Sequence, residues 1–128
     1  MAYSFENIIA WQKAHAFVLL VYRVTKHFPK DEIFGQTSQF RRAAVSIEAN
    51  IAEGYKKLSK ADKLRFFNIS QGSLEECRDY INLSRDLGYI SQIEFEELHT
   101  GLETTSKFLN SYCKAIVNNN ALKKEEGM

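Results

Sequence analysis

Proline is nearly absent from the chain, and its scarcity excludes several fold classes. Pro29 is the single proline among 128 residues, and there are only six glycines. A sandwich of many short strands needs more turn-forming residues, whereas long helices are permitted because little interrupts them. The hydrophobic share of 45% and the charged share of 26% are ordinary for one globular domain. We therefore expect residues 1–128 to form a single domain.

Cysteine, net charge and long apolar runs are also scarce. Cys77 and Cys113 lack the spacing of a metal site and fall inside helical patterns, so we expect free thiols and a cytoplasmic location. The net charge of +1 gives no overall attraction to nucleic acid or to a membrane. The apolar run over residues 14–22 is too short to span a bilayer and ends at Arg23. It predicts a buried helix.

Apolar residues recur at steps of three and four in four segments, which predicts four helices. The first helix is expected to begin after the N-cap candidate Asn7 and to end at Phe28–Pro29, because the residue before proline avoids the helical region. The second is expected over about residues 34–57. The apolar stripes of these two segments are Trp11, Ala14, Val18, Val21 and Phe28, and then Phe40, Ala44, Ile47, Ile51 and Leu58.

Capping signals delimit the third and fourth helices. Ser59 with Asp62 predicts the start of the third helix, and Gly88 predicts its end. Ser91 with Glu94 predicts the start of the fourth. A frayed tail is expected over about residues 118–128. The apolar stripes are Phe66, Phe67, Leu74, Cys77, Ile81 and Leu87, and then Phe95, Leu98, Leu102, Thr105, Leu109, Tyr112 and Ile116.

Short connections between long helices force neighbours to run antiparallel. The sequence therefore predicts an all-α fold, an up-down-up-down four-helix bundle.

Bundles of this kind often hold metal, but the ligands for a di-iron site are incomplete. Such a site needs two Glu-x-x-His motifs and two further glutamates. The chain has one motif, Glu96 to His99, and the other histidines lack the upstream glutamate. We expect a solvated face there, with no metal and no cofactor.

Catalytic signals are equally weak. Arg23 and His27 lie four residues apart, a spacing that would place a phosphate-binding arginine and a general base on one helix face of a ribonuclease. Helical nucleases place more residues between the two, so the pair departs from their pattern, and a solvated basic helix end is the default interpretation. No nucleophile elbow or glycine-rich phosphate loop is present, so no catalytic residue is predicted.

Polar residues occupy positions where a bundle is normally apolar. Arg42, Ser46 and Glu53 fall near one face of the second helix, with Arg41, Glu48 and Asn50 beside them, and Gly72-Ser73 interrupts the third helix before Glu75 and Glu76. A glycine inside a helix suggests a bend or a close backbone contact. Two interpretations stay open: an Arg–Glu network between helices or subunits, and a recognition surface for a ligand or partner.

Basic residues gather at one end of the predicted bundle, where the connection between the second and third helices lies beside both termini. A lysine cluster can hold a phosphate backbone without reading its sequence. A merely soluble surface is the alternative. The residues of this hypothetical nucleic-acid-binding surface are Lys56, Lys57, Lys60, Lys63, Arg65 and Lys114.

The second helix carries a block that resembles a known family. Residues 39–47 read Gln-Phe-Arg-Arg-Ala-Ala-Val-Ser-Ile, and residues 50–54 read Asn-Ile-Ala-Glu-Gly. With Glu32-x-Phe34-Gly35, Gly72-Ser73 and Leu87-Gly88-Tyr89, this block strongly resembles bacterial four-helix bundle proteins of the 23S rRNA intervening-sequence family. The motif positions that the resemblance assigns to fold or assembly are Arg41, Arg42, Ser46, Asn50, Glu53, Gly54, Gly72, Ser73 and Glu76.

The resemblance implies a homo-oligomer, typically a pentameric barrel. The accessory protein of diversity-generating retroelements is similar, and it binds nucleic acid and a reverse transcriptase. We therefore expect a non-enzymatic, oligomeric binding or scaffold protein that contacts RNA or DNA through the lysine-rich end. The alternative is a protein-interaction module without nucleic-acid binding, for example a partner of a neighbouring gene's product. A helical ribonuclease using Arg23 and His27 comes third.

Overall fold

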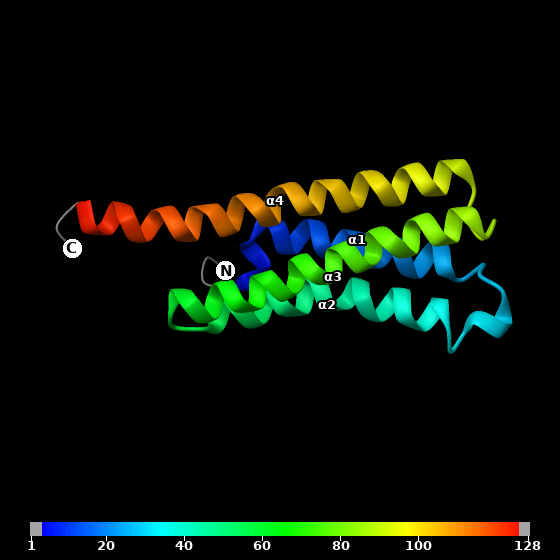
Figure 1. The fold of residues 1–128 in the computed structure, drawn as a ribbon, viewed down its shortest axis with the longest axis horizontal. Coiled ribbons are helices and arrows are strands. Elements are labelled where there is room, and N and C mark those ends of the chain that lie inside the picture. Colours follow the sequence, from blue (N-terminus) through cyan, green and yellow to red (C-terminus); the bar gives the residue numbers. More distant parts are fainter. Residues whose placement is uncertain (1–3, 126–128) are drawn as a thin grey trace.

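The computed structural model describes residues 4–125, with side chains described through residue 118. Over this range the chain is all-helical, with four α-helices and no strands (Figure 1), as the sequence predicts. The α-helices are α1 (Ile9–Thr25), α2 (Gln36–Lys56), α3 (Lys60–Asp86) and α4 (Gln92–Glu125), and two 3-10 helices are η1 (Phe5–Asn7) and η2 (Lys30–Glu32).

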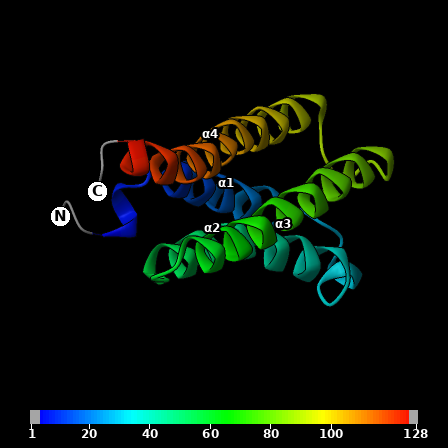
Figure 2. The ribbon, with the colours of Figure 1, turned by 60° about the vertical axis from the view of Figure 1, so that its left-hand side comes forward.

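Each long helix packs against two others. α1 lies between α2 and α4, and α3 also contacts α2 and α4, with the most extensive contact between α2 and α3. The turn between α2 and α3 lies at the same end as η1 and the last turns of α4, and the other two connections lie at the opposite end (Figures 1 and 2). In the described part of the chain, no helix has the length and apolar character needed to cross a membrane.

The capping residues predicted for α3 and α4 are confirmed. Ser59 caps α3, because its side chain accepts a hydrogen bond from the backbone N–H of Asp62 at 3.1 Å. Ser91 and Glu94 exchange hydrogen bonds at 2.8 and 3.1 Å, which makes a complete capping box.

The end of α3 is a left-handed glycine, as predicted. Gly88 has a φ of 77°, and the backbone N–H groups of Tyr89 and Gly88 donate to the carbonyls of Ser84 and Arg85. This is the Schellman pattern, which satisfies carbonyl groups left free by the end of the helix.

Both predicted ends of the first helix are wrong. Asn7 belongs to η1, which Ser4 caps, and α1 begins at Ile9 without a side-chain cap. The helix ends at Thr25, three residues before Phe28, because the chain tightens into turns there, with the N–H of Phe28 donating to the Thr25 carbonyl at 3.1 Å. These turns bring Phe28 into the core beside Tyr89, with ring centroids 5.3 Å apart.

The fourth helix continues past residue 118, where the sequence predicted a frayed tail. Its backbone stays helical to Glu125. Residues 118–125 contain neither proline nor glycine, so no residue in this stretch interrupts a helix. The fraying itself stays a prediction.

The predicted apolar stripes form the core, with two clear exceptions, Leu58 and Leu87. Leu87, at the C-cap of α3, keeps 48% of its surface exposed. Leu58 was expected to bury itself at the end of the second helix, but it is fully exposed. The reason is that α2 ends at Lys56, so Leu58 lies in the turn before Ser59 rather than on the buried face. The buried members of the stripes include Ala14, Val18, Val21, Phe40, Ala44, Ile47, Ile51, Phe67, Leu74, Cys77, Ile81, Leu98, Leu102, Thr105 and Leu109.

Two glycines have opposite surroundings. A Cβ atom on Gly54 would lie 2.6 Å from the ring of Phe67, so this glycine allows α2 to approach α3 closely. A Cβ on Gly72 would meet nothing within 4 Å. The close contact that the sequence suggested at Gly72 is therefore absent; the close contact is at Gly54 instead.

The two glycines provide a matched pair of variants. Gly54→Ala should lower the free energy of unfolding by about 1–3 kcal/mol, because the buried ring of Phe67 must move. Gly72→Ala should raise it by roughly 0.5–1 kcal/mol, because alanine favours the helix and has open space. Urea denaturation followed by circular dichroism measures both. Equal effects of the same sign would contradict this assignment.

Candidate functional surfaces: a basic tip, a polar row and an apolar groove

The turn between α2 and α3 forms the basic tip, which we define as Lys56, Lys57, Lys60, Lys63 and Arg65. Lys57 leaves the helix in an extended conformation while its N–H donates to the carbonyl of Gly54 at 3.2 Å. Ser59 then starts α3 directly. A turn this short keeps the two helix ends together, and their basic residues with them.

Lys63 has a structural role within the tip. Its Nζ donates to the carbonyl of Tyr55 at 2.7 Å and lies 3.4 Å from that of Gly54, both in the last turn of α2. Carbonyls in the last turn of a helix have no partner further along the helix, and the ammonium group donates to two of them here, so it caps the helix. Burial lowers the pKa of Lys63 below its usual value. Lys63 is therefore already engaged, and its side chain is not free to meet a phosphate.

Lys57 and Arg65 flank an aromatic ring. The Nζ of Lys57 lies 4.9 Å and the guanidinium carbon of Arg65 lies 4.8 Å from the centroid of Phe66. Each cation also has an acidic neighbour close to it in sequence: Glu53 lies 3.7 Å from Lys57, and Asp62 lies 3.6 Å from Arg65. Exposed pairs of this length are weak and screened by salt, so a polyanion can compete for both cations.

Lys56, Lys60 and Lys114 are the most available cations of the predicted set. Lys56 is exposed and Lys60 half-buried, and neither forms an ion pair with a described carboxylate. Lys114 is exposed on α4, whose C-terminal half extends along the same end (Figure 1). The structure thus brings five of the six predicted residues together at one turn and places the sixth on a separate helix.

The capping role of Lys63 can be tested against its neighbour. Lys63→Ala should lower the free energy of unfolding by about 1 kcal/mol, because two carbonyls lose a charged donor. Lys60→Ala removes the same charge without a hydrogen bond and should change stability by less than about 0.5 kcal/mol. Thermal and urea unfolding would compare them. Indistinguishable curves for the two variants would refute the capping role.

A polar row follows the outer seam between α2 and α3. Arg42 donates to Glu76 at 2.7 Å, and the hydroxyls of Ser46 and Ser73 are 2.7 Å apart. The Asn50 amide donates to the carbonyl and hydroxyl of Ser46 at 2.9 and 3.0 Å. Side chains from the family motif therefore join two helices of one subunit, as in the first of the two interpretations left open by the sequence.

Arg41 and Glu53 face elsewhere. The Nε of Arg41 donates to the Thr25 hydroxyl at 2.8 Å, and its guanidinium lies 4.6 Å from the ring centroid of Tyr22. It thus ties α2 to the last turn of α1. Glu53 pairs with Lys57 at the tip. Of the two arginines that the sequence singled out on α2, only Arg42 pairs with a glutamate of α3, Glu76. Glu75 pairs instead with Arg78 of its own helix, which also contacts Glu103 on α4.

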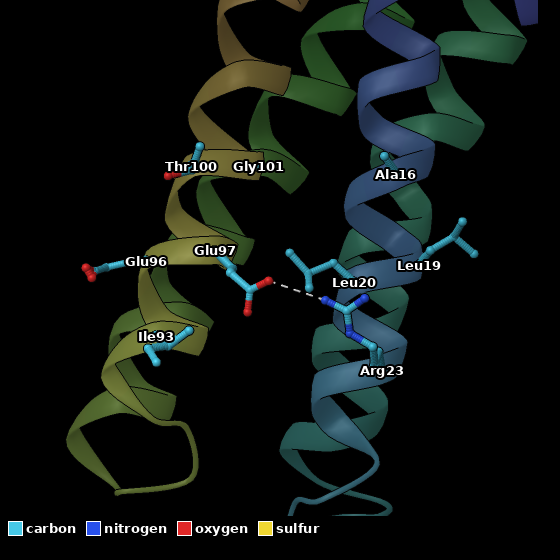
Figure 3. A pocket seen from close by; sticks show the side chains of 9 residues that line it. All are labelled: Ala16, Leu19, Leu20, Arg23, Ile93, Glu96, Glu97, Thr100 and Gly101. Atoms are coloured by element: carbon cyan, nitrogen blue, oxygen red, sulfur yellow. Dashed lines mark hydrogen bonds and ion pairs between the residues drawn. The ribbon is translucent and has the colours of Figure 1, made fainter.

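An apolar groove of about 670 Å³ lies between α1 and α4 (Figure 3). Leu20 points into the gap between the two helices, and the pair Arg23 and Glu97, 3.5 Å apart, bridges it. Leu19 and Ile93 keep 59% and 72% of their surface exposed at its sides. The remaining lining residues are Ala16, Glu96, Thr100 and Gly101.

This groove was not predicted from the sequence, although the sequence carries a signal for it. Residues 17–21 are five consecutive apolar residues, and a helix can bury only about one face against its own bundle. Phe17, Val18 and Val21 are buried, so Leu19 and part of Leu20 remain outside. A continuous apolar run therefore predicts a second contact surface.

The arrangement assumed for a ribonuclease is wrong. Arg23 is in the last turn of α1, whereas His27 lies beyond its end at Thr25, so the two do not share a helix face. Arg23 instead contacts Glu97 on α4. His27 is exposed.

The cysteines and His15, which are the other candidate reactive groups, lie in packed or hydrogen-bonded environments. Cys77 and Cys113 are free, as predicted, and burial raises the pKa of both thiols, which disfavours the nucleophilic thiolate. His15 stacks on Trp11, with ring centroids 4.8 Å apart, and its Nδ1 lies 3.0 Å from Glu48. Among the described residues, no three His, Cys, Asp or Glu side chains form a group that could hold a metal ion.

The arrangement of the helices is shared with a solved structure. The chain is similar to a protein with unknown function from the S23 ribosomal protein family of Bacteroides thetaiotaomicron, with a TM-score of 0.76 and 24% identity over 83% of this chain and 96% of that chain. At this identity the likeness shows the fold alone. No curated protein is a match. The family model for the 23S rRNA-intervening sequence protein matches residues 6–111, which include α1 to α3, and the chain belongs to this family, as its central motif predicted.

Proposed function

We propose that this chain is a non-catalytic, homo-oligomeric binding protein of the cytoplasm that contacts RNA or DNA through its basic tip. The observation that carries the proposal is the combination of available cations and an aromatic ring at one turn. Lys56 and Lys60 have no acidic partner among the described residues, and Lys57 and Arg65 both lie over the ring of Phe66. When these two cations move onto phosphates, they uncover the ring for a base, and cations with an aromatic platform are the usual elements of single-strand binding.

Oligomerisation would multiply a weak contact. Each tip offers few phosphate contacts, so a single copy binds weakly at physiological salt. Several tips held on one body act together, because binding at one raises the effective concentration at the next. The family resemblance favours a pentamer, and the proposal adopts that number.

The proposed contact can be tested by electrophoretic binding to single- and double-stranded RNA and DNA over a salt series. In Lys56→Ala/Lys60→Ala the affinity should fall, and the slope of log K against log salt should become shallower by about 0.7 for each single-strand phosphate that the variant no longer neutralises. Lys63 stays in place in this variant, because its removal would disturb the end of α2.

A control variant with the same change of net charge distinguishes binding at the basic tip from a general effect of net charge. Lys26→Ala/Lys107→Ala removes two exposed cations outside the tip and should retain nearly the parent's affinity. The proposal fails if the tip variant binds as well as the parent, or if both double variants lose affinity equally.

A protein-interaction module without nucleic-acid binding is the second candidate, and the apolar groove between α1 and α4 favours it. Exposed apolar patches of this kind mark contacts with other proteins more often than with polyanions. No retention on any nucleic acid at low salt, together with a stable complex on co-expression with the product of a neighbouring gene, would support this candidate over the first.

A further inference from the structure

Phe34 is presented to solvent by a fixed loop between α1 and α2. It keeps 92% of its surface exposed, and Ile33 beside it keeps 57%. The loop is held by Glu32, whose carboxylate accepts hydrogen bonds from the Tyr89 hydroxyl at 2.6 Å and from the backbone N–H of Gln36 at 3.1 Å. These bonds lower the pKa of Glu32. Phe34 and Ile33 together present apolar surface that contact with another surface would remove from water.

The groove between α1 and α4 is a surface of matching character. Leu20 and Ile93 provide apolar surface, and the small residues Ala16 and Gly101 also line the groove (Figure 3). A Cβ atom on Gly101 would lie 3.9 Å from Leu20, so this leucine packs closely against α4 at the bottom of the groove. Its volume of about 670 Å³ can receive a large side chain together with a neighbour. Phe34 does not occupy the groove of its own chain, because it is almost fully exposed.

Phe34 and the groove lie at the same end of the bundle but on different sides. The groove is formed by the second half of α1 and the first turns of α4, and the α1–α2 connection lies at this end (Figure 1). Phe34 leads into α2, whereas the groove is on the α4 side of α1. Rotation of a copy about an axis parallel to the helices moves its Phe34 loop to another side of the assembly but leaves the loop at the same level along the axis. A second copy related in this way can therefore reach the groove without sliding along the bundle.

The charges beside the two surfaces are complementary. Lys30, four residues before Phe34, is exposed, and so is Glu96 on the rim of the groove. Neither forms an ion pair with a described residue. The contact of Arg23 with Glu97 across the groove is long, and both side chains are largely exposed, so it can rearrange on docking.

We propose that the groove between α1 and α4 binds the Phe34 loop of a second copy of this chain, with Lys30 of the loop facing Glu96 of the groove. The inference rests on the oligomeric part of the proposed function and names the surfaces that make it. The Phe34 loop and the groove are different patches, so the contact is heterologous. Its repetition produces a closed ring when the successive rotations add up to a full turn.

The first test compares two exposed apolar residues at opposite ends. Phe34→Ser should weaken assembly by about thirtyfold, the loss typical of a central aromatic in an interface. Leu58→Ser, at the fully exposed tip, should leave assembly unchanged. Light scattering over a dilution series measures the mass, and circular dichroism checks that both variants keep the helices of the parent.

The second test identifies the groove as the receptor. Lys30→Glu and Glu96→Lys should each weaken assembly, and the double variant should restore most of the parent's affinity, because the exchanged charges attract again. An interface in which the two residues are apart would show no rescue.

The outcomes separate the two proposals. A monomeric parent at all concentrations overturns the oligomeric part of the proposed function and this inference with it. An oligomeric parent whose mass is unchanged by Phe34→Ser overturns this inference alone. If Phe34→Ser loses assembly but the double variant Lys30→Glu/Glu96→Lys does not regain it, Phe34 lies in an interface, and the groove is not the surface that binds it. Nucleic-acid binding is measured separately and decides neither result.

Discussion

Where α2 meets α3, Gly54 brings the helix backbone so close to Phe67 that one added carbon would lie 2.6 Å from the ring. Farther along the same seam, the buried hydroxyl of Ser70 donates to the carbonyl of Ile47 at 2.8 Å. Small and hydroxyl-bearing residues thus hold two long helices together from the turn to the middle of the molecule. This close contact fixes the position of the basic tip at one end and of the polar row along the outside.

Because this contact holds the ends of α2 and α3 together, the lysines of the basic tip have different roles, although they look alike in the sequence. Lys63 holds the last carbonyls of α2, and its positive charge stabilises the helix end that carries Lys56. Lys57 has Glu53 as a neighbour. One lysine therefore supports the backbone, one is partly neutralised and others are available to a ligand. A count of charges in the sequence cannot assign these roles, since they depend on which carbonyls and carboxylates are within reach.

Local signals predicted much of the fold because their effects are local. Ser59, Gly88 and the Ser91–Glu94 box act within a few residues, and the structure confirms each. Contacts between helices were harder to predict, because they depend on how two helices are rotated against each other. The sequence suggested a bend or a close contact at Gly72, and the structure shows open space beside it. The sequence also placed Leu58 in the core, where the structure shows it fully exposed.

For the candidate surfaces, too, features local in sequence were predictable, whereas features that combine several helices were not. Sequence spacing was sufficient to place the basic residues at one turn, because they are neighbours along the chain. The groove combines Leu20 from the first helix with Ile93 from the last, and the sequence offered only the excess of apolar residues at 17–21 as a sign of it. The partner of Arg42 was predicted by residue type, and its location on α3 within the same subunit emerged only from the fold.

The placement of charge along the helices has a consequence for any assembly of parallel copies. The basic tip lies at one end of the molecule, and Asp31 and Glu94, in η2 and the first turn of α4, lie at the other (Figure 1). The second end also carries the exposed Lys26 and Lys30, so its charge is mixed. In an assembly of parallel copies, the basic tips would gather on one side, and that side would attract a polyanion more strongly than the other. The polarity of a single subunit would thus decide on which side of the assembly such a ligand lies.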